Sequence, residues 1–169
     1  MKKPLSLLRL IFLITISGCT NPFAPSFDDS NENLSTISDL KTIEGVFQNF
    51  KYAYTFKDTT IYGEFISEDF VFTYRDYDNE VDVSWGREDE MKTTYGLFQN
   101  TQQLNLIWNN IVLSSVDSTN ANIIRSFNLT ITFNPTFIQQ GSGRVNLSLR
   151  KNPETEKWQI TRWLDESNF

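Results

Sequence analysis

The stretch IIRSFNLTITF, from Ile123 to Phe133, alternates apolar with polar side chains along most of its length. Such alternation is typical of a strand that buries one face. The same pattern recurs in three neighbouring segments, at residues 104–109, 144–150 and 158–163. Turn-forming residues separate the segments at 117–120, 139–143 and 152–157. The second half of the chain therefore predicts antiparallel strands with one apolar face and one face rich in Asn, Ser and Thr.

Helical patterns precede these strands. Apolar residues recur at helical spacing from Ile43 to Tyr54, with Thr42 as the predicted N-cap. A short second helix is expected at 61–66, started by Asp58, and one further strand is expected at 70–75, followed by a turn at 76–80.

A third helix is expected to open at Gly86. Three acidic residues follow in its first turn, where the helix dipole favours them, and Met91, Tyr95 and Phe98 form its predicted apolar face. The expected fold class is α+β, with three N-terminal helices packed in the concave face of a curved, mainly antiparallel sheet.

The amino end carries a different signal. Lys2, Lys3 and Arg9 accompany an apolar run that is too short for a spanning helix, which needs about 20 apolar residues. The run ends in Ile16-Ser17-Gly18-Cys19, which resembles the bacterial lipobox. The resemblance implies that the Cys19 thiol receives a diacylglycerol and that the peptide before it is removed. The alternative is an ordinary buried cysteine in a core helix.

These features predict three regions. Residues 1–18 are a lipoprotein signal peptide, residues 19–37 are the lipidated cysteine with a flexible polar tether, and residues 38–169 are one α+β domain. The lipid on Cys19 would hold the domain to a bacterial membrane, outside the cytoplasm. Thr20 follows the cysteine where retention-signalling lipoproteins often carry aspartate, so the resemblance favours the outer membrane over the inner one.

Composition excludes several kinds of partner. The net charge is −6, and loss of three basic residues with the signal would make it more negative, so nucleic acid is not an expected partner. The chain has no histidine and a single cysteine, which excludes an intramolecular disulfide and the usual zinc, copper and haem sites. We expect no metal and no cofactor.

Three stretches carry a second resemblance: FKD at 56–58, FISEDF at 65–70 and KWQITRW at 157–163. The domain resembles the cystatin-like cone of the nuclear transport factor 2-like superfamily, in an uncharacterised family of bacterial lipoproteins. The fold hosts many activities. At the positions that the ketosteroid isomerases use, this chain has Phe50 and Tyr74, which cannot replace their tyrosine and aspartate.

Other enzymes of the superfamily fit no better. The scytalone dehydratases need histidines, which are absent. The limonene epoxide hydrolases need an Asp-Arg-Asp set, and no aspartate of inward parity stands beside Arg125. We therefore assign no catalytic residue.

The cone implies a cavity between the first helix and the long strands. Its predicted wall consists of Phe50, Tyr54, Trp85, Trp108 and Arg125. Such a cavity is apolar with one cation, which suits an apolar acidic small ligand. The alternative is that aromatic side chains fill the space, while Arg125 reaches solvent or pairs with an acid such as Glu88 or Asp165.

Three functions follow from this reading. The first is a lipid-anchored, non-catalytic ligand-binding or interaction module of the cell envelope. The second is an enzyme of isomerase, dehydratase or hydrolase type with an unrecognised site, which requires a carboxyl group of raised pKa in the pocket. The third is a structural module that forms homodimers through its sheet face.

Overall fold

The computed structural model of the chain describes residues 37–167. Over this range the helices are α2 (Ile43–Phe56), α3 (Thr59–Phe65) and α4 (Arg87–Asn100). The strands are β1 (Ile66–Asp76), β2 (Val81–Gly86), β3 (Gln103–Val116), β4 (Asn120–Asn134), β5 (Phe137–Lys151) and β6 (Trp158–Ser167). The predicted α+β class is confirmed, although β1 and β2 both precede the third helix.

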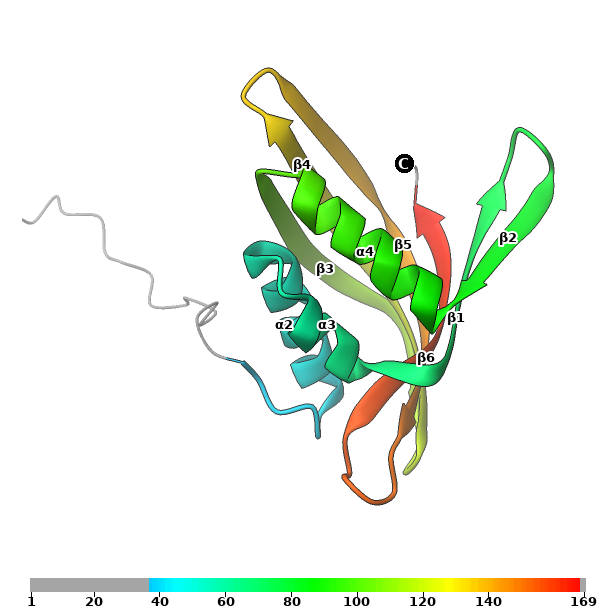
Figure 1. Cartoon of the computed structure of the whole chain (residues 1–169). Helices are drawn as coiled ribbons and strands as arrows, with labels where there is room; N and C mark the ends of the chain where they lie inside the picture. Colours follow the sequence, from blue (N-terminus) through cyan, green and yellow to red (C-terminus); the bar gives the residue numbers. More distant parts are fainter. Residues whose placement is uncertain (1–36, 168–169) are drawn as a thin grey trace, which may run out of the picture. The chain divides into compact units, whose positions relative to one another are not determined.

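The six strands form one sheet in the order β2-β1-β6-β5-β4-β3. The sheet is mixed, because β1 and β6 pair in parallel while the other pairings are antiparallel. Figure 1 shows the long strands β3, β4 and β5 curving behind α4, with the β1–β2 hairpin at the opposite edge. The parallel pairing joins the first and last strands, so β6 lies in the middle of the sheet.

Capping side chains explain where the first two helices begin. The Thr42 hydroxyl accepts a hydrogen bond from Gly45 N at 3.0 Å, which caps α2. The Asp58 carboxylate caps α3 by accepting from the backbone N–H groups of Thr60 and Ile61 at 2.9 and 3.0 Å. Both predicted caps are confirmed, since each side chain satisfies N–H groups that have no partner within the helix.

The predicted turn at 139–143 is wrong, because these residues belong to β5. The chain turns earlier, where Asn134 Oδ1 accepts from the Thr136 N–H and hydroxyl at 3.0 and 2.9 Å. Gly143 lies inside the strand for a different reason: a Cβ atom there would collide with Ser167 of β6. The glycine therefore permits a close approach of two strands and forms no turn.

The strand β2 is absent from the predicted elements. Its apolar residues Val81, Val83 and Trp85 do alternate with Asp82 and Ser84, but the run is short and its side chains are mostly exposed. It is held by its register with β1, in which Trp85 lies opposite Phe72. The alternation after the turn at 77–80 was therefore a local signal for this strand, and the pairing with β1 completes a hairpin.

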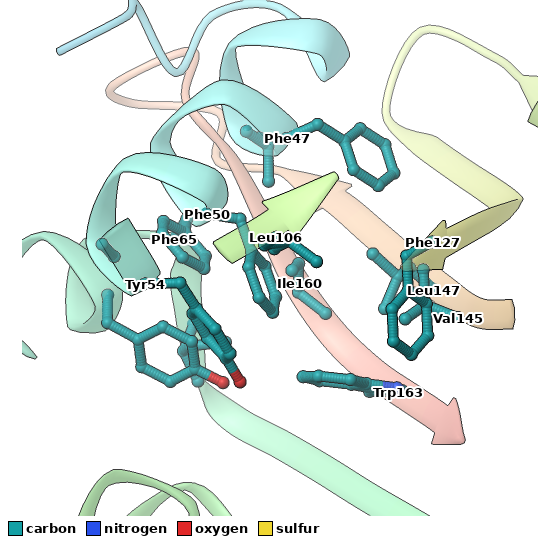
Figure 2. Packing of buried hydrophobic residues seen from close by; sticks show 14 of the residues in the cluster. Phe47, Phe50, Tyr54, Phe65, Leu106, Phe127, Val145, Leu147, Ile160 and Trp163 are labelled. Atoms are coloured by element: carbon teal, nitrogen blue, oxygen red, sulfur yellow. The ribbon is translucent and has the colours of Figure 1, made fainter. Parts of the chain in front are cut away.

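The core joins α2 and α3 to the strands. Figure 2 shows Phe50 and Tyr54 directed from α2 toward Trp163 and Phe127 of the sheet. Phe47, Phe50 and Phe65 are at most 1% exposed, and the Trp108 indole donates to the Phe47 carbonyl at 2.9 Å. Burial of several large aromatic side chains, each removing apolar area from water, is the main stabilising term here.

The predictions for the amino end of the chain concern residues that the structure does not describe. Cys19, the signal peptide and all but the last residue of the predicted tether lie outside the described residues. Within residues 37–167, no helix combines the length and the apolar character that a membrane crossing requires.

Candidate functional site

A cavity of about 340 Å³ lies between two helices and the sheet. Most of its wall is aromatic or aliphatic, and its polar groups come from α4, β6 and the Tyr54 hydroxyl of α2. The lining residues are Phe50, Tyr54, Phe72, Trp85, Glu90, Thr93, Thr94, Leu97, Leu106, Trp108, Phe127, Leu129, Val145, Trp163, Asp165 and Ser167. This size and composition are typical of a site for a small molecule.

Glu90 is the most buried charged side chain of the site, with 4% of its surface exposed. Three donors converge on its carboxylate. The Tyr62 hydroxyl and the Thr94 hydroxyl donate to Oε1 at 2.6 and 3.2 Å, and the Trp85 indole donates to Oε2 at 2.7 Å. These hydrogen bonds satisfy a buried carboxylate that would otherwise be costly.

The position of Glu90 reveals an error in the predicted face of the third helix. Tyr95 is 55% exposed, and the buried residues of α4 are Glu90, Thr94 and Phe98. The helix thus turns a partly polar stripe inward, because the cavity and the donors of Tyr62 and Trp85 lie there. The spacing of four residues between these three side chains was the available signal. A search for apolar residues alone misses this signal, because Glu90 and Thr94 are polar.

Asp165 enters the same cavity from β6. Alternation from Ile160 would point Asp165 away from the core, but the register of β5 and β6 shifts between Ser148 and Leu149. Thr161 is the extra residue of this bulge, and it reverses the parity of the residues that follow. Asp165 thus has an inward direction that the sequence analysis did not assign to it, although its carboxylate is not a partner of Arg125.

The environment of Asp165 favours its neutral form. Burial raises the pKa of the Asp165 carboxyl above its ordinary value, and the nearby Glu166 raises the pKa further. The hydrogen bonds from the Ser167 hydroxyl and N–H, at 2.8 and 3.2 Å, oppose this shift. A carboxyl group of this kind can exchange a proton near neutral pH more readily than an exposed one.

Two further groups of the wall can donate hydrogen bonds. The Nε1 atom of Trp163 is buried and makes no hydrogen bond, a situation found nowhere else among the buried side-chain polar atoms of residues 37–167. The Tyr54 hydroxyl forms none of the hydrogen bonds of the Glu90 network. Burial, together with Glu90 and Asp165, raises the pKa of Tyr54 far enough to keep this hydroxyl protonated.

Four of the five residues predicted for the pocket lie in its wall: Phe50, Tyr54, Trp85 and Trp108. Arg125 is not among the lining residues. Its side chain is 14% exposed and does lie on the helix side of the sheet, with the guanidinium carbon 4.7 Å from the centre of the Phe47 ring.

The partners of Arg125 explain why it stays out of the cavity. Arg125 Nη1 donates to Glu44 at 2.9 Å, and Nε donates to the Asn109 carbonyl at 3.0 Å. Asn109 lies in a bulge of β3, where the register with β4 shifts. The partner acid is thus Glu44, in the first turn of α2, and neither Glu88 nor Asp165. Arg125, which was predicted as the cation of the pocket, instead joins α2 to the sheet.

The ionisable groups of the cavity wall are therefore acidic, whereas the sequence analysis predicted one cation, Arg125. Glu90 and Asp165 line it, and among residues 37–167 no Lys or Arg side chain does. Nor do three or more Cys, Asp or Glu side chains of the described range gather as they would around a metal ion. The wall can accept hydrogen bonds through Asp165, donate them through Tyr54 and Trp163, and hold an apolar body between its rings.

Comparison with known proteins identifies the fold. No protein-family model and no curated protein matches the chain. Solved structures do: a nuclear transport factor 2-like superfamily protein from Salmonella enterica has a TM-score of 0.59 at 16% identity, over 75% of this chain and 89% of that one. A conserved protein from Planctomyces limnophilus has a TM-score of 0.65 at 13% identity, over 74% and 92%.

A third neighbour is named as a candidate scytalone dehydratase, from Novosphingobium aromaticivorans. Its TM-score is 0.63 at 17% identity, over 77% of this chain and 84% of that one. At such identities the likeness shows the fold alone, which is nuclear transport factor 2-like.

Proposed function

We propose that the protein is a lipid-anchored bacterial envelope protein whose domain binds a small, largely apolar ligand. In this proposal the three helices lie in the concave face of the sheet, and the cavity between them is the binding site. The observation that carries it is a cavity of about 340 Å³ with aromatic walls and a buried, unpaired Trp163 N–H. An orphaned buried donor costs free energy, which an acceptor on a ligand would recover.

The proposal differs from the apolar acid of the sequence analysis. That ligand depended on Arg125 as the cation of the pocket, and Arg125 pairs with Glu44 instead. Two carboxyl groups in the wall disfavour an anion. A ligand without negative charge suits this wall better.

Tryptophan fluorescence tests the proposal directly, because Trp85, Trp108 and Trp163 all line the cavity. The probe is 3-tert-butylphenol, a neutral apolar molecule with one oxygen acceptor. We expect saturable quenching or enhancement in the full-length chain. Thr93→Trp places a large ring at an exposed position of the wall and should weaken binding at least about tenfold, roughly 1.4 kcal/mol.

Gln99→Trp is the matched control, since Gln99 is exposed on the same helix and does not line the cavity. It should leave the dissociation constant unchanged, although its added indole changes the absolute signal. No saturable binding in the wild type, or equal losses in both variants, would contradict the proposed site.

An enzyme is the second candidate, and Asp165 is the observation that favours it. Its carboxyl has a raised pKa and lies in the cavity, as the sequence analysis required of an enzyme. A carboxyl of raised pKa beside a neutral Tyr54 hydroxyl suits general acid–base chemistry, such as loss of water from a β-hydroxy carbonyl compound. The likeness to a candidate dehydratase supports the same class.

A screen of apolar β-hydroxy carbonyl compounds, with products followed by NMR, tests this candidate. Turnover that falls about 10²–10⁴-fold in Asp165→Asn would support a catalytic carboxyl. Binding without any turnover across the screen would favour the non-catalytic module.

The lipid anchor depends on Cys19, which has no structural description here. The Ile16-Ser17-Gly18-Cys19 ending supports it, and the outer membrane is the proposed location. Cys19→Ser should abolish palmitate labelling and release the protein from the membrane fraction. Unchanged labelling and fractionation would remove the anchor from the proposal.

A homodimer through the sheet face also remains a proposal. It is supported by exposed apolar side chains on β3 and β5: Ile107, Ile111, Val112, Leu113, Val116, Phe137 and Ile138. The β3 side chains from Ile111 to Val116 lie at one end of the strands, and Phe137 and Ile138 lie at the other. Exposed apolar side chains that gather along one strand, as on β3, are often an interface. Sedimentation of the wild type and of Val112→Lys tests it. A wild-type dimer that the substitution dissociates would support the proposal, and a monomer in both cases would contradict it.

A further inference from the structure

The charge of the cavity wall points to a particular class of ligand. Glu90 comes from α4 and Asp165 from β6, and these are the only ionisable carboxyl groups of the wall within the described range. Three donors fix the Glu90 carboxylate in place, while Asp165 receives only the two hydrogen bonds of Ser167. Asp165 therefore keeps acceptor capacity for a ligand, and both groups make the cavity attractive to positive charge.

The rings of the wall act in the same direction. Seven aromatic side chains line the cavity: Phe50, Tyr54, Phe72, Trp85, Trp108, Phe127 and Trp163. The face of an aromatic ring is negative, and a cation within about 6 Å of the ring centre is attracted to it, most strongly by tryptophan. Cages of such rings bind ammonium groups that carry methyl or other alkyl substituents, because these cations are weakly hydrated.

The same wall disfavours other ligands. A hydrated metal ion would need several free oxygen ligands, and the Glu90 oxygens are already occupied by three donors. An anion would meet two carboxyl groups and no cationic side chain of residues 37–167. A purely hydrocarbon ligand would leave the Trp163 N–H without a partner.

On the basis of the proposed function, we propose that the ligand is an organic monocation: an alkylated ammonium group on an apolar body that also carries an oxygen acceptor. The ammonium group lies among the rings near Asp165 and Glu90. The oxygen accepts from Trp163 Nε1 or from the Tyr54 hydroxyl. No covalent step is involved.

Three probes of nearly equal shape test the charge of the ligand. They are (3-hydroxyphenyl)trimethylammonium, its neutral isostere 3-tert-butylphenol, and the anion 3-tert-butylbenzoate. Titration calorimetry on the full-length chain at pH 6.5, where the phenols are protonated, gives the three dissociation constants. We expect the cation to bind at least about tenfold tighter than the neutral isostere, and the anion to bind more weakly than either.

Asp165→Asn removes one charge and preserves the shape of the side chain. It should reduce the preference for the cation at least about threefold while leaving the affinity for 3-tert-butylphenol nearly unchanged. Asp78→Asn makes the same chemical change in the exposed β1–β2 turn, outside the wall, and should alter neither affinity.

A pH series on the wild type gives a second readout, independent of whether any variant folds. Cation affinity should rise with pH as Asp165 ionises, and binding should release protons over the same pH range. The other ionisable groups that face Asp165 are Glu166 on its own strand, Tyr54 from α2, Glu90 from α4 and Tyr74 beside it on β1. Burial raises the pKa of Tyr54, so it stays protonated in this range, and Asp165→Asn should flatten the profile.

The outcomes separate this inference from the proposed function. Equal binding of cation and neutral isostere, both weakened by Thr93→Trp, would overturn the cation and keep the cavity as the site. Preference for the benzoate would also overturn it. Absence of binding by all three probes would overturn both.

Discussion

At the scale of single residues, the site shows how much a sequence pattern can and cannot predict. Phe50, Tyr54 and Trp108 were placed in the wall by helical spacing and strand parity, and all three line the cavity. Glu90 and Asp165 were missed. The helix dipole explains the first without its burial, and a bulge at Thr161 turns the second inward. The spacing of the buried residues Trp158, Ile160 and Trp163 was the local signal for that bulge.

The raised pKa of Asp165 predicts a dependence of stability on pH. In the unfolded chain the group has its ordinary pKa of 3.8, whereas burial raises the pKa in the folded protein. The contribution of protonated Asp165 to the stability of the folded state is therefore fully present below pH 3.8. It is lost as the pH rises through the folded-state pKa. Above that value the ionised carboxylate destabilises the folded state.

Asp165→Asn removes this ionisation at every pH. Its melting temperature should exceed that of the wild type at pH 7 by a few degrees, at roughly 2–4 °C for each kcal/mol, and the gap should close toward pH 4. Differential scanning calorimetry checks this, with Asp78→Asn as control. A gap that is independent of pH would contradict the burial of Asp165.

Arg125 supports a prediction about structure alone. Its guanidinium pairs with Glu44 and lies over Phe47, so Arg125→Met should lower the free energy of unfolding by about 1–2 kcal/mol. It should leave the affinity for 3-tert-butylphenol unchanged, because Arg125 does not line the cavity. Arg144→Met, at an exposed position, should change stability by less than about 0.5 kcal/mol. Urea unfolding measures both, and a loss of ligand affinity in Arg125→Met would return this residue to the site.

At the scale of elements, the sequence predicts most of the helices and strands and misses those set by neighbours. The caps Thr42 and Asp58 act within their own helices, so local chemistry is sufficient. The inward stripe of α4 depends on Tyr62 and on strands of the cavity wall that lie elsewhere in the chain. Gly143 was assigned to a turn because the strand that approaches it, β6, is invisible in the local sequence.

Two glycines test this account of the elements. Gly96 lies in α4 with no atom within 4 Å of an added Cβ, so Gly96→Ala should stabilise the protein by about 0.5–1 kcal/mol. Gly143→Ala should destabilise it by about 1–3 kcal/mol, because the methyl group would collide with Ser167. Both values come from urea unfolding under identical conditions. Equal effects of the two substitutions would contradict the close packing of β5 on β6.

At the scale of the whole molecule, the helices and the sheet meet around a space that side chains do not fill. From the sequence, the aromatic residues could either line this space or fill it. The aromatic side chains of α2 and α3 pack on one another and on tryptophans of the sheet: Phe50 lies 5.3 Å from Phe65 and 5.4 Å from both Trp108 and Trp163, measured between ring centres. The space that remains is bordered by Trp85, Trp108 and Trp163.

The central claim is that this space is the binding site, and intermolecular NOEs measure it most directly. The tert-butyl protons of 3-tert-butylphenol give one sharp signal that can be followed to protein protons within about 5 Å. The account predicts NOEs from this signal to the indole protons of Trp85, Trp108 or Trp163 and to the Phe127 ring, and their loss in Thr93→Trp. NOEs confined to the exposed side chains of β3, such as Ile111 and Val112, would contradict it.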